Sequence, residues 1–596
     1  MACSDSADPG SRPAVTADSD SGAEDSGGPG RPPAGALVLD HAVVVDASGA
    51  RERAAVILTG DTIWAVTDAG QDWPSDVTVR DLDGASVVPG LIDSHVHLFH
   101  SGAMGWVGDT LAANLSADLS WGVTGVADLG APVEIFALRD RIASGEITGP
   151  RIFATGPFLT AELSHPCETV NDPTLCVYVN GDGAARVAAL DEADGVKVAL
   201  ADAGFTDWPT PRLDLGDLAD ITGAAAAAGQ TVFAHIDEGE DAADALAAGV
   251  GVLAHPVFGE RLRVAPHGVT LSTLGAFSGV GAVVDGSLLD EDLRATPAAV
   301  VEAWTWWSRH PDAFLEGWVE GNAAWADAAA ANLALGVAQG ETILAGSDAG
   351  YWFVPHGVGL HRELSGLVEA GMSPLDALVA ATSAPAALLG WTDLGFVAEG
   401  YRADLLIVSG RPDQDIGALR QIEAVYLGGA LWQGGALREG GQAAEGGFCL
   451  EDADCEGACD LVAHTCARTC DEPYDRVSTC GPEAWCRPAD GLDTSPEGVC
   501  AQGAGCDLYA QDCAPASYGE NCAPADLDTN VCWPAGPRGV GASCSWSDAS
   551  LYCEQGLYCS WVDYTCYQLC DPDGPATCAR CVTQTVEGAP WFGLCL

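Results

Sequence analysis

The stretch VPGLIDSHVHL, residues 88–98, decides the fold of this chain because it opens a long alternation of strand-like and helix-like segments. Its apolar residues form a short run typical of a buried strand, and its polar end carries His95 and His97. Because side chains alternate along a strand, these two imidazoles lie on the same face. The stretch therefore predicts a buried strand with a pair of histidines at its carboxyl end.

Similar apolar segments follow as far as residue 350, separated by Ala-rich amphipathic stretches such as LADITGAAAAAG (218–229) that are typical of helices. Eight strand–helix units over about 300 residues predict an α/β fold, a (β/α)8 TIM-like barrel at residues 89–391. In such barrels the chemistry lies at the carboxyl ends of the strands. The later strand segments are GVTGVADLG (122–130), RIFATG (151–156), GVKVAL (195–200), QTVFAH (230–235), GVGVLAH (249–255), GVTLST (268–273) and ETILAGSDAG (341–350).

Short β-branched segments with Gly and Asp turns flank this region on both sides, at residues 36–88 and 392–440. The first flank begins ALVLDHAVVVDASGA, and the second contains LGFVAEGYRADLLIVSG. We expect the two flanks to combine into one composite β-sandwich domain beside the barrel.

The net charge of −60 restricts the partners of the protein. The phosphates of nucleic acid need basic side chains, and so does an anionic membrane surface. We therefore exclude nucleic acid as a partner. The acidity itself is typical of a strongly solvated surface.

Most of the cysteines lie in the tail: 20 of the 23 fall between Cys449 and Cys595. A dense, even set in a Gly- and Pro-rich sequence predicts disulfide-rich irregular modules made in an oxidising compartment. Zinc knuckles are the competing interpretation, although the tail has no paired CxxC motifs. The spacing Cys459-x6-Cys466-x3-Cys470 recurs as Cys559-x6-Cys566-x3-Cys570, so we expect repeat modules within 441–596. Their predicted ranges are 449–500, 506–532 and 544–595, and the ligand of this tail is unknown.

The leader, residues 1–35, is rich in Ser, Asp, Gly and Pro and is predicted to be a disordered tether. Cys3, at its start, is similar to the lipidated cysteine of a mature bacterial lipoprotein, so a lipid anchor at Cys3 is one interpretation. A stray cysteine is the other. With the cysteine-rich tail, the leader predicts an exported bacterial protein, either a cell-envelope lipoprotein or an extracellular one.

Ligand-type residues also stand at the ends of three later barrel strands. These residues are His235, His255 and Asp348. Any one of them could be an ordinary buried polar residue, but together with His95 and His97 they predict a metal site at the mouth of the barrel.

Lys197 is the only lysine in the chain, and it lies in the fourth strand segment; all other basic side chains are arginine. An uncharged lysine amine can add CO2 and become a carbamate, an anionic ligand that can bridge two cations. The guanidinium of arginine stays protonated and cannot do this. We therefore interpret Lys197 as a carbamylated bridging ligand.

These residues, with the flanking text, resemble the binuclear metal-dependent amidohydrolase superfamily over residues 36–440. The resemblance rests on VPGLIDSHVHL, on ILAGSDAG, on ELSGLVEAGMSPLDALVAATSAPAALLG (363–390) and on GFVAEGYRADLLIVSGRP (395–412). His235 and His255 are twenty residues apart, and this short spacing is similar to the imidazolonepropionase and prolidase-like branch.

The resemblance implies two divalent metal ions. Zinc suits the nitrogen and oxygen ligands, and manganese, iron or cobalt stay open. It assigns His95, His97 and Asp348 to the buried metal and His235 and His255 to the second, with carbamylated Lys197 between them. A hydroxide bound by both ions would attack a carbonyl, while Asp348 takes its proton and passes it to the leaving nitrogen.

The expected function is hydrolysis of amide-type C–N bonds in a small-molecule substrate, either a dipeptide or an N-acyl amino acid. A lactonase or esterase is the nearest alternative, because the same hydroxide attacks those bonds. A catalytically inactive surface adhesion or scaffold protein is the alternative from another class.

The prolidase-like branch also implies a substrate-binding histidine after the third strand. His165 lies in that loop, within ATGPFLTAELSHPCETV, but the usual Gly-Gly-His-Gly context is missing. Cys167 and Cys176 nearby are predicted to form a disulfide that stiffens the loop.

Overall fold

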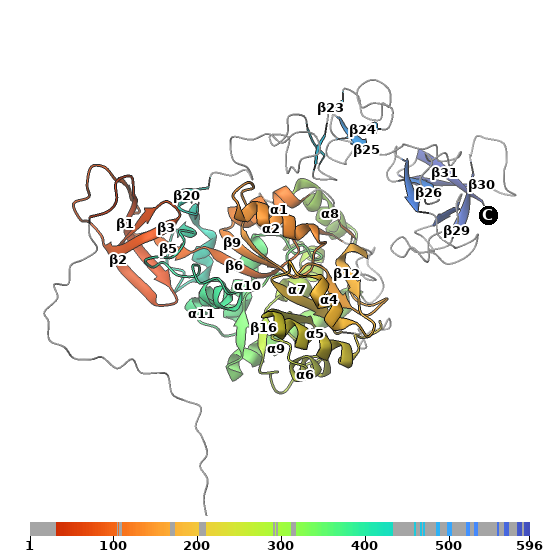
Figure 1. Ribbon diagram of the computed structural model, residues 1–596, viewed down its shortest axis with the longest axis horizontal. Coiled ribbons are helices and arrows are strands. Elements are labelled where there is room, and N and C mark those ends of the chain that lie inside the picture. Colours follow the sequence, from red (N-terminus) through yellow and green to blue (C-terminus); the bar gives the residue numbers. More distant parts are fainter. Residues whose placement is uncertain are drawn as a thin grey trace, which may run out of the picture.

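The computed structural model (Figure 1) describes residues 31–432, together with short strands in the tail from residue 458 onward. Within the first range it leaves out residues 104, 107–109, 167–172, 202–209, 290–292, 294–295 and 312–317. Residues 1–30 of the predicted leader, with Cys3, lie outside the described part. The lipid anchor therefore stays a prediction.

Two segments far apart in the sequence form one β-sheet, coloured red and teal in Figure 1. The strands run in the order β20-β19-β18-β5-β1-β2-β3. The strands are hydrogen-bonded into a single sheet that branches at β1, because β4 pairs with the first half of β1 and β5 with its second half. Residues of β1, β2, β5 and β18 share one apolar cluster, and the two-layered sandwich that we expected stays a prediction. The strands are β1 (Leu37–Asp46), β2 (Gly49–Thr59), β3 (Thr62–Asp68), β4 (Thr78–Asp81), β5 (Ser86–Pro89), β18 (Leu405–Val408), β19 (Ile422–Leu427) and β20 (Ala430–Leu431).

Parallel strands form the TIM-like barrel, and a strand occurs in each predicted segment. The third strand is split, because β10 pairs only with β9 whereas β11, which the sequence did not predict, pairs with β13. The first and last strands close the barrel: the N–H of Ser94 donates to the carbonyl of Ala345 (3.0 Å) and that of His97 to Ala349 (2.8 Å). The strands are β6 (Leu91–Val96), β9 (Val123–Asp128), β10 (Arg151–Ala154), β11 (Phe158–Thr160), β13 (Gly195–Ala199), β14 (Thr231–His235), β15 (Val252–Leu253), β16 (Val269–Leu271) and β17 (Thr342–Leu344).

Helices surround the barrel, and their ends follow local sequence signals. In α5, Asp214 caps the first turn by accepting from Gly216 N, and Gly229 ends the helix with φ 75°, a conformation that glycine adopts without strain. The main helices are α1 (Leu111–Ser120), α2 (Glu134–Ala143), α4 (Gly183–Ala189), α5 (Leu215–Ala228), α6 (Gly239–Ala247), α7 (Leu274–Val284), α8 (Ala298–Arg309), α9 (Trp318–Gln339), α10 (Val358–Glu369), α11 (Pro374–Ala380) and α12 (Ser383–Leu388).

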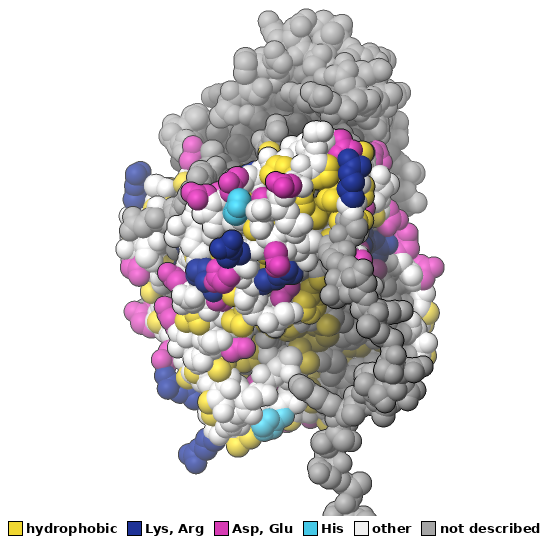
Figure 2. All heavy atoms as spheres, turned by 90° about the vertical axis from the view of Figure 1, so that its left-hand side faces the viewer, with side chains coloured by type: hydrophobic (Ala, Val, Ile, Leu, Met, Phe, Trp, Pro, Cys, Tyr) yellow, Lys and Arg dark blue, Asp and Glu magenta, His cyan; other side chains and the backbone are white. Residues whose placement is uncertain are grey.

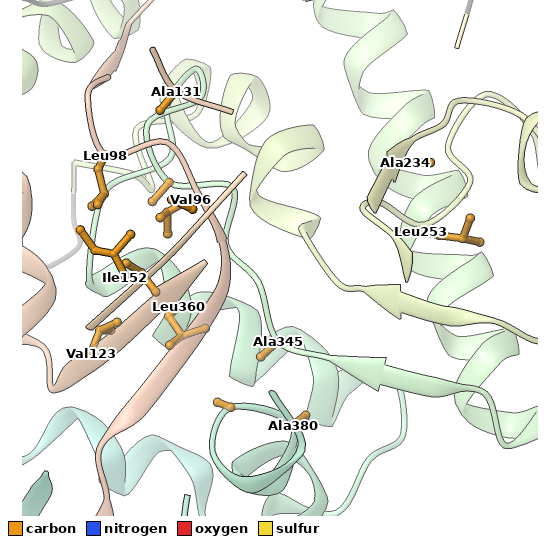
Figure 3. Packing of buried hydrophobic residues seen from close by; sticks show 14 of the residues in the cluster. Val96, Leu98, Val123, Ala131, Ile152, Ala234, Leu253, Ala345, Leu360 and Ala380 are labelled. Atoms are coloured by element: carbon orange, nitrogen blue, oxygen red, sulfur yellow. The ribbon is translucent and has the colours of Figure 1, made fainter. Parts of the chain in front are cut away.

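A continuous apolar core joins the barrel to its helices and to the sheet (Figure 3). Val96 and Val123 from barrel strands lie in the same cluster as Leu406 from β18. At Gly122 the backbone comes so close to Leu406 that an added Cβ would lie 2.2 Å from its Cδ2 atom. The barrel is therefore packed directly against the sheet.

Figure 2 shows the molecule from the side of the β-sheet. Acidic side chains are scattered over this face among arginines and are not gathered in one patch. Ion pairs such as Arg51–Asp68 and Arg402–Asp61 lie in this sheet. Among the described residues, no helix is both long enough and apolar enough to cross a membrane.

In the tail the structure describes short strands. In the hairpin of β21 (Ala458–Asp460) and β22 (Thr465–Ala467), Cys459 stands opposite Cys466. In β28 (Leu557–Cys559) and β29 (Cys566–Cys570), Cys559 stands opposite Cys566, which is the same position in the repeated spacing. The rest of the predicted modules lies outside the described residues, and their disulfides stay a prediction.

Candidate metal centre

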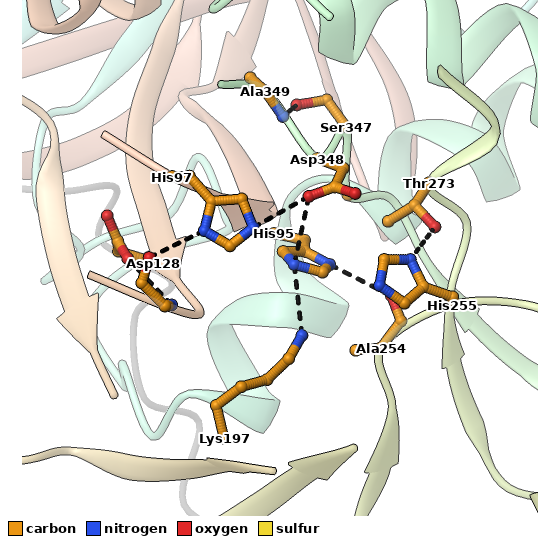
Figure 4. Close-up of polar contacts among 12 residues, drawn as sticks. His95, His97, Asp128, Lys197, Ala254, His255, Thr273, Ser347, Asp348 and Ala349 are labelled. Atoms are coloured by element: carbon orange, nitrogen blue, oxygen red, sulfur yellow. Dashed lines mark hydrogen bonds and ion pairs between the residues drawn. The ribbon is translucent and has the colours of Figure 1, made fainter. Parts of the chain in front are cut away.

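The histidine pair at the end of β6 lies at the centre of the site (Figure 4). Nδ1 of His95 donates to the carbonyl of Ala254 (3.1 Å), and Nδ1 of His97 donates to the carbonyl of Gly130 (2.9 Å). A carbonyl oxygen can only accept, so each ring carries its hydrogen on Nδ1 and keeps the lone pair of an uncharged imidazole on Nε2. Burial lowers the pKa of His95 well below its usual range. These two rings are therefore prepared to bind a cation through Nε2.

Asp348 faces the same two nitrogens from the loop after β17. Its Oδ1 atom lies 3.4 Å from Nε2 of His95 and 3.1 Å from Nε2 of His97. Burial would raise the pKa of this carboxyl, but the neighbouring imidazoles hold it well below its usual range. The residue has φ 62°, a left-handed conformation that is uncommon outside glycine, and its N–H donates to the carbonyl of His95 (2.8 Å). The barrel closure thus holds a carboxylate in place against the histidine pair.

Lys197 enters this group from β13. Its side chain is fully buried, and Nζ lies 3.3 Å from Nε2 of His95 and 5.4 Å from the centre of the Phe158 ring. Among the described residues, it forms no ion pair with a carboxylate. Burial lowers the pKa of the Lys197 amine to about 7, so much of it is uncharged near neutral pH.

His235, at the end of β14, and His255, two residues past β15, form the other side of the site. Their rings meet edge to face with centroids 4.6 Å apart, and His255 lies 5.0 Å from His95. Nδ1 of His255 is hydrogen-bonded to Oγ1 of Thr273 (2.9 Å). Burial lowers the pKa of His235 to about 3 and that of His255 well below its usual range, so both rings are neutral.

His165, the predicted substrate-binding residue, stacks on His235 with ring centroids 4.1 Å apart. Burial lowers its pKa well below the usual range as well. Cys176, which begins β12 (Cys176–Tyr178), is disulfide-bonded, while its predicted partner Cys167 lies outside the described residues. The loop after the third strand therefore brings His165 to the metal side of the barrel mouth.

The structure brings together every predicted ligand, and the residues fit a cation site. Oδ1 of Asp348 is buried and has no hydrogen-bond partner, as expected of an atom that binds a cation. One ligand atom from each of His95, His97 and Asp348 lies within 4.8 Å of the others. Nitrogen and oxygen ligands of this kind suit zinc and similar divalent metals.

Two buried carboxyls that the sequence did not single out support the site from beneath. Asp93 accepts from the N–H groups of His95 (3.2 Å) and Ser347 (2.9 Å) and meets the hydroxyl of Ser347 at 2.5 Å. Glu363, on α10, accepts from Leu274 N (2.9 Å) and from the hydroxyl of Ser272 (2.8 Å) on either side of Thr273. Asp93 lies in the LIDSHVH motif and Glu363 begins the segment ELSGLVEAGM, but neither was predicted to be a site residue.

Aromatic rings cover the His235–His255 side of the site. Phe258 lies 6.4 Å from His235, and Phe277 lies 6.0 Å from His255. Trp325 of α9 packs against Phe258 at 6.1 Å. A substrate held at these two histidines therefore meets an apolar wall, which the sequence alone did not locate.

Barrel and site together define a metal-dependent hydrolase of the TIM-barrel type. Residues 86–431, more than half of the chain, match the model of the Amidohydrolase family, and the chain belongs to that family. It is an amidohydrolase that acts on carbon–nitrogen bonds of the amide type. No curated protein matches the chain.

Solved structures share the fold of this chain. A Xaa-Pro dipeptidase with bound methionine in the active site has 23% sequence identity and a TM-score of 0.54, and the match covers 67% of this chain and all of that one (100%). A prolidase complexed with N-methylphosphonate-L-proline has 23% identity and a TM-score of 0.53, over 67% of this chain and 100% of that one. Molinate hydrolase has 18% identity and a TM-score of 0.52, over 67% and 95%.

Proposed function

We propose that the protein hydrolyses dipeptides or N-acyl amino acids with two divalent cations, in the manner of the prolidase-like branch of its family. The observation that carries the proposal is the position of Lys197, a buried amine 3.3 Å from the cation-binding nitrogen of His95. Burying a charged lysine without an ion-pair partner costs free energy. The burial of Lys197 among cation ligands is explained if its amine reacts to form an anionic ligand.

Each cation would have its own ligands. His95, His97 and Asp348 would hold the first, His235 and His255 the second, and Lys197 would contribute to both as its carbamate. The carbamate forms when the lone pair of Nζ attacks CO2 and the new N–C bond is followed by loss of one proton. When bound, two such cations lower the pKa of a water molecule and polarise the substrate carbonyl.

The protein side chains would then divide the remaining work. Asp348 is the proton carrier, because its carboxylate is the basic group buried closest to His95 and His97. It would accept a proton from the attacking water and deliver it to the leaving nitrogen. His165, stacked on His235, would hold the substrate at the mouth of the barrel. The wall formed by Phe258, Phe277 and Trp325 favours a substrate with an apolar group next to the scissile bond.

The relatives with solved structures support this class of substrate. Two of them are a Xaa-Pro dipeptidase and a prolidase. A panel of dipeptides and N-acyl amino acids, assayed with protein loaded with zinc in bicarbonate buffer, tests the proposal. We expect release of the amine or amino acid, most rapidly from substrates with an apolar group.

Asp348→Asn is the control for this assay. Asparagine tolerates the left-handed backbone at this position, so the fold should persist while turnover disappears. Turnover of lactones or esters together with no reaction on any amide would contradict the proposal and favour the esterase interpretation.

We also propose that the protein is exported and held to the bacterial cell envelope by a lipid on Cys3, with the cysteine-rich tail oxidised. The density of cysteines in the tail and the disulfide at Cys176 support this proposal. Growth of the expressing bacterium with a labelled fatty acid should label the wild-type protein and not the Cys3→Ser variant. Equal labelling of both, or of neither, would contradict the anchor.

A further inference from the structure

His235 is held differently from the other three histidines of the centre. His95 and His97 donate from Nδ1 to carbonyl oxygens, and His255 bonds to a hydroxyl. All three of these Nδ1 partners are uncharged, and the carboxylate of Asp348 faces His95 and His97 only at Nε2, the nitrogen proposed to bind the first cation. The ring of His235 instead meets a carboxylate outside the predicted ligand set, because its Nε2 atom lies 3.2 Å from Oδ1 of Asp237.

The backbone of Asp237 is held in place, so this contact does not depend on a loose loop. Asp237 comes two residues after the end of β14, and its side chain is only 7% exposed. Its N–H donates to Oδ2 of Asp241 (3.2 Å), and its carbonyl accepts from the N–H groups of Phe258 and Gly259 (both 3.0 Å). Asp241 is itself anchored by Arg212 at 2.8 Å.

The charges of the two ligand sets suggest what the contact between Asp237 and His235 does. The first set of ligands has two imidazoles and the carboxylate of Asp348, whereas the second has the two imidazoles of His235 and His255 and shares Lys197. A buried carboxylate against His235 supplies negative charge on that side. The two groups lie within ion-pair distance, and a hydrogen bond from Nε2–H to this carboxylate would fix the ring, because it would keep the lone pair on Nδ1 and make the imidazole a more basic ligand.

We propose that Asp237 is a positioning residue for the second cation: it fixes the orientation and tautomer of His235 and strengthens the ligand. His165 restrains the face of the same ring and Asp237 its edge, so the imidazole has little freedom to turn. This inference rests on the proposed two-cation function. It assigns to the second cation a residue outside the ligand set predicted from the sequence.

The experiment is a metal titration of the apoprotein with zinc against a chelating indicator, followed by a cobalt titration read by visible absorption. Asp237→Asn keeps the shape of the side chain and removes its charge. We expect the first cation to bind as in the wild type and the second to bind about 10- to 100-fold more weakly, the usual effect of losing such a partner. The part of the cobalt spectrum that appears with the second equivalent should shift in the variant.

Glu240→Gln is the matched control, because Glu240 is exposed on α6 and its removal subtracts the same charge from the same segment. It should leave both affinities unchanged. His235→Ala, which removes a ligand of the second cation, shows in the same titration how large the complete loss of that cation is. Asp237→Ser serves as a second variant if the asparagine form does not fold.

The outcomes separate this inference from the proposed function. A wild-type protein that binds fewer than two cations contradicts the proposed function and this inference with it. A wild type that binds two, with an Asp237→Asn variant that binds both equally well, overturns this inference alone. An unchanged second affinity with a raised KM would mean that Asp237 contacts the substrate, and it too would overturn the positioning role.

Discussion

The two halves of the proposed metal centre are built in different ways. In the first half, main-chain hydrogen bonds between the first and last barrel strands set the ligands: His97 N donates to Ala349 O, and Asp348 N donates to His95 O. In the second half, His235 ends β14 and accepts a main-chain bond from Leu200 N (3.1 Å), His255 follows β15, and side chains hold both rings. The partners are Asp237, Thr273 and His165.

This difference shows what each half depends on. Main-chain bonds form wherever the barrel closes, so the first half follows from the fold itself. Side-chain partners can be lost one at a time without loss of the barrel. We therefore expect substitutions around the second half to change cation affinity with little effect on folding, and substitutions under the first half to change both.

The largest expected loss of turnover comes from substituting Lys197, the residue proposed to contribute to both halves. Lys197→Arg replaces the amine by a guanidinium that cannot form a carbamate and adds a buried charge beside His95. We expect turnover to fall by at least about 10³-fold, equivalent to several kcal/mol of lost cation-dependent stabilisation, with fewer than two cations bound. Elemental analysis and the dipeptide assay measure this. Unchanged turnover would contradict the carbamate, whatever the metal content.

The sequence predicted that the residues of the first half lie together, and it did so for a physical reason. His95, His97 and Asp348 lie at strand ends that apolar patterns reveal, and parallel strands bring their carboxyl ends to one mouth. Lys197 stood out because no other lysine occurs in the chain.

The partners of the second half could not be predicted in this way. β15 has only two residues, and the contacts of His255 and His235 depend on which loops lie beside them. The split of the third strand into β10 and β11, and the single sheet that branches at β1, likewise depend on pairing between distant segments and not on local pattern.

The next largest effect should come from removing the carboxyl of Asp93, which supports the first half of the site. Asp93→Ala leaves the N–H groups of His95 and Ser347 without their acceptor and opens a small cavity. Because both groups are buried, the free energy of unfolding should fall by about 3 kcal/mol, and binding of the first cation should weaken as well. Chemical denaturation of the apoprotein measures the first change. Asp93→Asn, which keeps the shape and the acceptor oxygen, should cost much less; an equal cost would contradict this account.

The third prediction concerns Glu363, the buried carboxyl next to Thr273, and the pH dependence of the free energy of unfolding. Burial raises the pKa of Glu363 from 4.5 to about 7. Since the folded protein then holds this proton more tightly than the unfolded chain, the contribution of this carboxyl to stability is greatest below about pH 4.5 and is lost as the pH rises to about 7. This carboxyl should contribute on the order of 3 kcal/mol to the decline. Glu363→Gln cannot titrate, so its unfolding free energy should fall less across that range; parallel pH profiles would contradict the assignment.

The smallest effect, and the sharpest test of the comparison, concerns the hydroxyl that holds His255. Thr273→Val keeps the size and branching of the side chain and removes the hydrogen bond to Nδ1 (2.9 Å). We expect the second cation to bind about tenfold more weakly while the first binds as before, because the first half has no contact with this hydroxyl.

The matched control is Thr222→Val, which removes another buried hydroxyl bond, to Ala248 O (2.7 Å), away from the centre. Both variants should lose about 1 kcal/mol of stability, but only Thr273→Val should change cation binding. Equal weakening of both cations in Thr273→Val would mean that the halves act as one unit and that their difference in construction has no consequence.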